Sequence, residues 1–155
     1  VGELRRGEYG VSITDGSGWT IIYEDTLGSP EARIVIAHEL GHIFLGHEYR
    51  SSSRRFACGD KKLSIEKEAD MFAIRILAPA FALHELNITD TARIAELCDI
   101  PYKIAADLSK RMKLLEDRAM YYINPLESRL RDRFASWLDE SRGLPDSGIL
   151  PHWLR

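Results

Sequence analysis

Apolar and polar residues alternate in two short runs near the start of the chain. Apolar side chains occupy every second position over residues 9–13 and again over residues 19–23. A period of two predicts half-buried β-strands. The segment between them, residues 15–18 (DGSG), consists of turn formers. The two runs therefore predict a β-hairpin.

The apolar spacing then changes to that of α-helices. A first long helix is predicted over residues 29–45, capped by Ser29 and stopped by Gly46. A second helix is predicted over residues 65–78, where Ser64 can cap the start and a proline follows the end.

The remaining pattern stays helical. Helices are predicted over residues 90–98, capped by Thr89, and over residues 102–118, followed by one last helix from Asn124 to Ser141. The first two resemble a helix-turn-helix, but acidic residues dilute the basic ones, so direct binding to nucleic acid is not predicted. The fold class is α+β, mostly helical, with a small antiparallel sheet.

Composition describes an ordinary globular chain. Its 155 residues are 45% hydrophobic and 29% charged, with a net charge of −3. Nothing in this balance indicates nucleic acid or an anionic membrane surface as a partner. No apolar run has the length of a membrane span. The two distant cysteines, Cys58 and Cys98, favour thiols in a reducing compartment, so a cytoplasmic location is expected.

The candidate chemistry lies in the first long helix, which contains the sequence HELGH at residues 38–42. Residues four apart on a helix lie on one face, so His38 and His42 present two imidazoles to one point, as a zinc ion needs. Glu39 lies beside them, where it can reach a water on that zinc without being a ligand. His47 comes one residue too early for the third histidine of a related protease pattern. It is therefore expected at the surface, at the end of the helix.

A third metal ligand is predicted on the second helix. Glu66 shares a helical stripe with Ala69 and Ala73, which packs inward, and an inward carboxylate requires a partner. A zinc ion held by the two histidines supplies one. Glu68 points to a different face and is the reserve choice. Asp70, one turn after Glu66, is placed to accept a hydrogen bond from a ligand imidazole.

These motifs resemble the ImmA/IrrE family of zinc metallopeptidases, which shows HELGH followed by an E-x-E-A-[ND]-x-F-A helix. Here that helix reads EKEADMFA over residues 66–73. The resemblance implies a minimal zincin-like core of the gluzincin type over residues 1–80, whose sheet edge can pair with an extended substrate. Residues 81–143 are then a helical extension packed on the core, and residues 144–155 are a tail.

The resemblance also implies the function. It indicates a metalloendopeptidase that cleaves a helix-turn-helix repressor of the Xre type, and so derepresses stress-response or mobile-element genes. One Zn²⁺ per chain is expected on His38, His42 and Glu66, with Glu39 as the catalytic base. Four residues are candidates to stabilise the oxyanion, and the sequence does not choose among them: Tyr23, Tyr49, Arg75 and His84.

The alternative is a non-catalytic module in which zinc stabilises a regulatory or DNA- or protein-binding domain. A closed site with four protein ligands would favour it, whereas catalytic sites keep three protein ligands and an opening. No fourth ligand is evident in the sequence.

Overall fold

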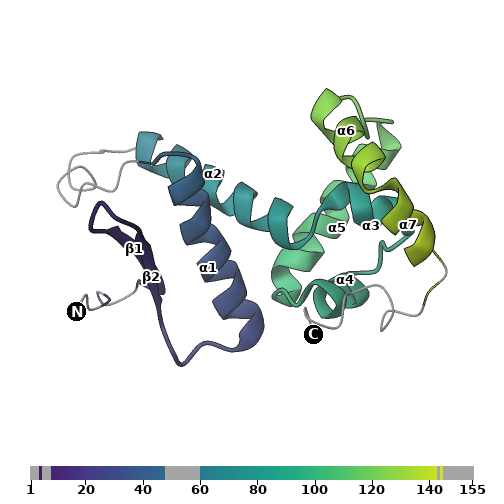
Figure 1. Cartoon of the computed structure of the whole chain (residues 1–155). Helices are drawn as coiled ribbons and strands as arrows, with labels where there is room; N and C mark the ends of the chain where they lie inside the picture. Colours follow the sequence, from purple (N-terminus) through teal and green to yellow (C-terminus); the bar gives the residue numbers. More distant parts are fainter. Residues whose placement is uncertain (1–3, 5–7, 48–59, 143, 145–155) are drawn as a thin grey trace. The chain divides into compact units, whose positions relative to one another are not determined.

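The computed structural model describes residues 4, 8–47, 60–142 and 144, and the chain forms two compact units, Val1–Leu77 and Ala78–Arg155. The first unit contains a two-stranded antiparallel hairpin and two long helices (Figure 1). Their bounds are β1 Gly10–Thr14, β2 Trp19–Tyr23, α1 Ser29–Phe44 and α2 Asp60–Leu77.

The second unit is helical in all of its described secondary structure. Its helices are α3 Ala80–Glu85, α4 Thr91–Cys98, α5 Tyr102–Asp117, α6 Pro125–Arg133 and α7 Ala135–Ser141. The mostly helical α+β fold class predicted from the sequence is thus confirmed. No helix in the described part of the chain is both long and apolar enough to cross a bilayer.

Several predicted helix boundaries were wrong. Gly28, not Ser29, is the N-cap of α1, and Asp90, not Thr89, caps α4 by accepting a hydrogen bond from Arg93 N–H. The second long helix begins at Asp60, so Ser64 lies inside it instead of capping it. A serine hydroxyl can cap the start of a helix, but it can also bond a neighbouring side chain inside one, as Ser64 does with Glu68. The sequence alone does not separate these two uses.

The predicted last helix is divided into α6 and α7 at Phe134, whose φ of −101° and ψ of 9° depart from helical values. The chain continues along a helical path, because Phe134 N–H still bonds the Leu130 carbonyl at 3.0 Å and Leu138 N–H bonds the Phe134 carbonyl at 2.9 Å. No glycine or proline marks this break in the sequence, which is why periodicity alone predicts one helix.

The hairpin does not place both apolar runs on one face. In its register Ser12 pairs with Ile21 and Gly10 pairs with Tyr23, and directly paired residues share a face. The face that carries Ser12 and Gly10 meets α1, so the apolar alternation of the first run lies on the opposite face. Tyr9 and Ile13 are accordingly 62% and 43% exposed. The residues of β1 that face α1 are small because the strand lies close to Val35, and Ser12 is polar because it bonds Glu39.

Gly10 allows this close contact between the strand and the helix. A Cβ atom added there would lie 2.4 Å from Val35 Cγ1 and 3.3 Å from Glu39 Cγ. Valine in a helix is held in essentially one rotamer, so the clash would not be relieved locally. We expect Gly10→Ala to lower the free energy of unfolding by about 1–3 kcal/mol, measured by chemical denaturation. Gly18→Ala is the matched control, since no atom lies within 4 Å of its added Cβ. Equal stability of the two variants would contradict this packing.

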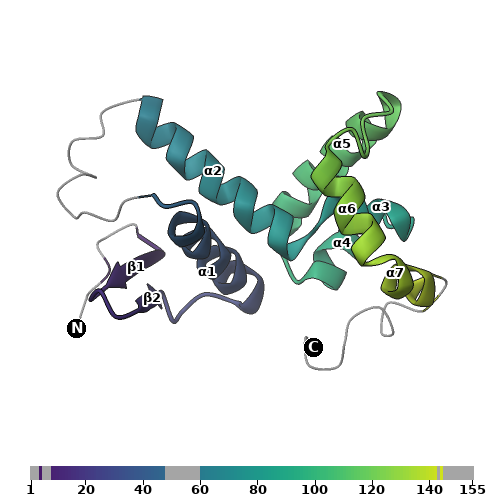
Figure 2. The same ribbon diagram turned by 45° about the horizontal axis from the view of Figure 1, so that its top comes forward.

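The helices α1 and α2 also cross at small residues. A Cβ at Gly41 would lie 3.1 Å from Ala69 Cα and 3.2 Å from Phe72 Cβ, and Ala69 and Ala73 are completely or almost completely buried. The helix α1 therefore lies between the hairpin and α2 (Figure 2). Small side chains at the crossing let the two backbones approach, so residues on α2 can reach those on α1.

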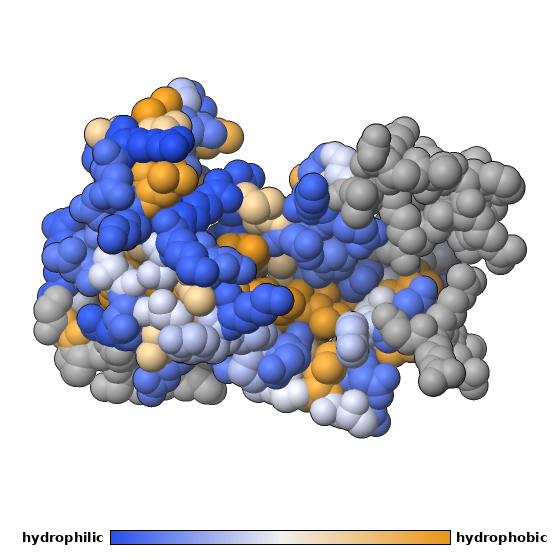
Figure 3. All heavy atoms as spheres, turned by 180° about the vertical axis from the view of Figure 1, so that it is seen from behind, coloured by the Kyte–Doolittle hydropathy of each residue, from blue (hydrophilic) through white to orange (hydrophobic). Residues whose placement is uncertain are grey.

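In the second unit, Glu85 joins α3 to the later helices. It accepts hydrogen bonds from the Tyr122 hydroxyl and from Arg142 Nη2, the latter at 2.7 Å. These bonds, that of Tyr122 above all, hold the pKa of the Glu85 carboxyl below its usual range despite partial burial. Apolar side chains reach the surface among charged ones around α6 (Figure 3). The exposed ones there are Ile123, Leu126, Leu130 and Phe134.

Candidate metal centre

The two histidines of HELGH lie on the side of α1 that is between its contact with the hairpin and its contact with α2. At about 100° per residue, His38 and His42 lie roughly 60° around the helix from the hairpin-facing Val35 and Glu39. They lie roughly 80° on the other side from Gly41, which faces α2. Any residue on α2 that reaches toward the histidine stripe therefore meets it from one side, while the hairpin borders it on the other.

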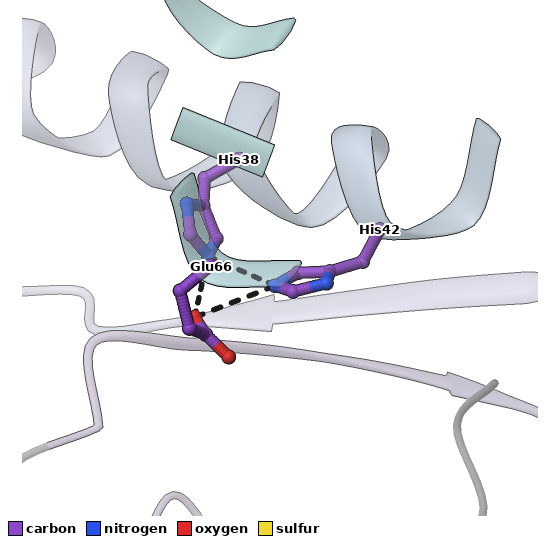
Figure 4. A group of neighbouring side chains, drawn as sticks. All are labelled: His38, His42 and Glu66. Atoms are coloured by element: carbon purple, nitrogen blue, oxygen red, sulfur yellow. Dashed lines mark hydrogen bonds and ion pairs between the residues drawn. The ribbon is translucent and has the colours of Figure 1, made fainter. Parts of the chain in front are cut away.

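Glu66 of α2 makes this approach. Figure 4 shows its carboxylate pointing at the two imidazoles. His38 Nε2 lies 3.0 Å from His42 Nε2, and Glu66 Oε2 lies 3.3 Å from His38 Nε2 and 3.6 Å from His42 Nε2. A tetrahedral zinc with ligand distances of ~2.1 Å needs donor atoms about 3.4 Å apart. The three spacings are all within a few tenths of an ångström of that value, so these three atoms could hold a metal ion.

The contacts of the other ring nitrogen, Nδ1, of each imidazole also fit metal binding through Nε2. A ligand nitrogen must offer a lone pair, so the proton of a neutral ring belongs on the other nitrogen. His38 Nδ1 lies 2.8 Å from Asp70 Oδ1, and His42 Nδ1 lies 3.0 Å from His47 Nδ1. In the tautomers that carry the proton on Nδ1, each Nδ1–H has an acceptor and both Nε2 lone pairs are left for a metal.

Glu39 is held apart from these donors. Its side chain is buried, with the residue only 4% exposed, and Ser12 Oγ donates a hydrogen bond of 2.7 Å to Glu39 Oε2. Ser12 is itself 1% exposed. The sequence does not single out Ser12, because a polar residue is expected at every second position of this alternating run.

The model of the IrrE N-terminal-like domain, a family of metallopeptidases, matches residues 5–118. The chain belongs to this family. The match begins before the hairpin and extends through α5, so it includes the three clustered donors as well as the first helices of the second unit. Searches of the curated proteins and of the solved structures found no significant match.

In this metallopeptidase the reserve ligand Glu68 has a different partner from Glu66. Its Oε2 lies 3.3 Å from His47 Nε2, and its Oε1 accepts a hydrogen bond of 3.0 Å from Ser64 Oγ. The bond from His47, and then that from Ser64, hold the pKa of the Glu68 carboxyl below its usual range. The expectation that His47 is a surface residue was wrong, because its side chain is only 10% exposed and contacts His42.

The oxyanion candidates that the structure describes come from three different elements, β2, α2 and α3. Tyr23 pairs with Gly10 and so lies on the sheet face that meets α1. Arg75 is nine residues after Glu66, which places it on the opposite side of α2 and about 13 Å along it. His84 belongs to the second unit, where its ring stacks on Tyr121 with centroids 3.9 Å apart. Tyr49 lies outside the described residues.

Proposed function

We propose that this metallopeptidase is a zinc-dependent endopeptidase in which His38, His42 and Glu66 hold one Zn²⁺ and Glu39 is the catalytic base. The observation that carries the proposal is the near-tetrahedral spacing of the three donor atoms beside a buried carboxylate. Among the described residues no fourth side chain joins this group. That favours an open catalytic site over a closed structural one.

The chain's own residues supply the proton transfers. When bound, zinc acts as a Lewis acid that acidifies water and polarises a peptide carbonyl. Glu39 accepts the proton of the attacking water and delivers it to the leaving amine. Ser12 fixes the Glu39 carboxylate through its 2.7 Å hydrogen bond, so the base is oriented before the substrate binds. Tyr23 is the oxyanion donor that we favour, because it lies on the sheet face toward α1.

We infer that the substrate is a helix-turn-helix repressor of the Xre type, cleaved in the cytoplasm to derepress stress-response or mobile-element genes. This inference is supported by the motifs at residues 38–42 and 66–73 together with membership in the family. In this proposal residues 1–80 form the catalytic core, with the sheet edge beside α1 receiving extended substrate. Residues 81–143 form the helical extension, and residues 144–155 form a tail.

Metal removal tests the proposal directly. The zinc-loaded protein would be incubated with a panel of purified Xre-type repressors, and the products identified by mass spectrometry. We expect one discrete cut in at least one repressor, loss of cleavage after chelation, and recovery when zinc is returned.

Two results would change this conclusion in different ways. Cleavage that persists after complete removal of metal would contradict metal-dependent catalysis. Cleavage of unstructured peptides but of no repressor would retain the endopeptidase and reject the proposed substrate.

A further inference from the structure

A line of hydrogen bonds continues behind His42, beyond the three proposed ligands. His42 Nδ1 meets His47 Nδ1 at 3.0 Å, and His47 Nε2 meets Glu68 Oε2 at 3.3 Å. Ser64 Oγ closes the line by donating to the other Glu68 oxygen at 3.0 Å. The ligand His38 differs, since it reaches the carboxylate of Asp70 directly.

The direction of these bonds follows from metal binding. If His42 Nε2 gives its lone pair to a metal, its proton resides on Nδ1, which must then donate to His47 Nδ1. The proton of His47 is thereby placed on Nε2, where it is donated to Glu68. Each contact then has one donor and one acceptor, so the two imidazoles share a single consistent set of tautomers. The line leads from a side chain that is 2% exposed to one that is 57% exposed.

The end of α1 is built so that His47 folds back over His42. Gly46 has a left-handed backbone with φ of +67°, a conformation that favours glycine. Gly46 N–H then bonds the Ile43 carbonyl at 3.2 Å, and His47 N–H bonds the His42 carbonyl at 3.0 Å. These two bonds are the Schellman arrangement. His47 is therefore attached to His42 through both its backbone and its ring.

We propose that His47 and Glu68 are positioning residues that hold His42 in its metal-binding tautomer and so set the affinity of the site for zinc. This rests on the proposed metal site of His38, His42 and Glu66. His38 bonds the carboxylate of Asp70 directly, whereas the imidazole of His47 lies between His42 and the carboxylate of Glu68. Neither residue is among the three clustered donors.

The affinity for zinc alone tests the proposal, measured on the whole chain by competition with a chromophoric chelator. Loss of a hydrogen-bonding partner of a ligand typically costs 10–100-fold in metal affinity. We expect His47→Ala to weaken zinc binding by about 10–100-fold and Glu68→Gln by about 10-fold. His47→Gln is expected to recover much of the loss, because its amide can accept from His42 and donate to Glu68. Glu140→Gln, at an exposed position on α7, is the matched control.

The thermal stability of the metal-free protein separates positioning from a merely structural role. A structural role would lower that stability in both variants and leave the zinc dissociation constant unchanged, which would overturn the proposal. Glu68→Gln keeps the test decisive if His47→Ala does not fold, since Glu68 is exposed and the change preserves shape.

The same titration separates this proposal from the proposed function. Weak or absent zinc binding by the wild type, or undiminished binding by Glu66→Ala, would reject the metal site itself. Tight binding by the wild type that Glu66→Ala loses, with unchanged affinity in both the His47 and Glu68 variants, would reject the positioning role alone.

Discussion

Glu39→Gln is expected to keep the wild-type zinc content and to lower kcat/KM by about 10²–10⁴-fold, the range of a general base. The amide has the shape of the carboxylate and can still accept the bond from Ser12, but it cannot take a proton from water. Zinc content should hold because Glu39 is not among the three clustered donors. Elemental analysis and initial cleavage rates on the same preparation would measure both quantities.

The variant Ser12→Ala should give a smaller effect in the same assay. A hydrogen bond to a charged group contributes about 1.5–3 kcal/mol, which corresponds to about 10–100-fold in rate if all of it orients the base. Thr20→Ala, which removes an exposed hydroxyl from the neighbouring strand, is the control.

For the first variant, wild-type activity in Glu39→Gln would show that Glu39 is not the catalytic base. Loss of zinc in Glu39→Gln would show instead that Glu39 is a metal ligand.

Glu66→Ala is expected to lose zinc, with an affinity reduced by more than about 100-fold, beyond the usual effect of residues that only bond a ligand. With two donors left from one helix, nothing would hold the ion between α1 and α2. Dialysis against a weak chelator followed by elemental analysis would show about one zinc per chain in the wild type and almost none in the variant.

Glu68→Gln, measured in the same experiment as Glu66→Ala, compares the two carboxylates that the sequence offers as the third ligand. A larger loss of zinc in the Glu68 variant would exchange their roles. Glu96→Gln, an exposed position on α4, shows what loss of a distant carboxylate does.

The sequence predicted those parts of the site that depend on regular spacing. His38 and His42 are one turn apart, and Glu66 shares a stripe with two alanines, so helix periodicity together with the family motif selected these three residues. Their donor atoms lie within 4.8 Å of one another in the structure. Periodicity also predicted the hairpin and the long helices.

The residues it missed act through contacts that periodicity does not describe. Ser12 meets Glu39 across 27 residues of chain, because the hairpin folds its polar face onto α1. His47 does not match the ligand pattern with a third histidine, so the sequence offered no reason to place it beside His42. The predicted end of the helix at Gly46 was the available signal, because a glycine there favours a left-handed turn. A Schellman turn there brings the residue after the glycine back to the third residue from the helix end, which is His42.

If a metal ion binds as proposed, the crossing of α1 and α2 through glycine and alanine makes the stability of the folded protein depend on the supply of that metal. Small side chains bury little apolar area, so this contact contributes less than a leucine interface would. A metal ion shared by the two helices, as proposed, adds about 2.7 kcal/mol when its free concentration is 100 times the dissociation constant. Cells short of zinc would then hold less of this protease, because the metal-free chain unfolds more often and is degraded sooner.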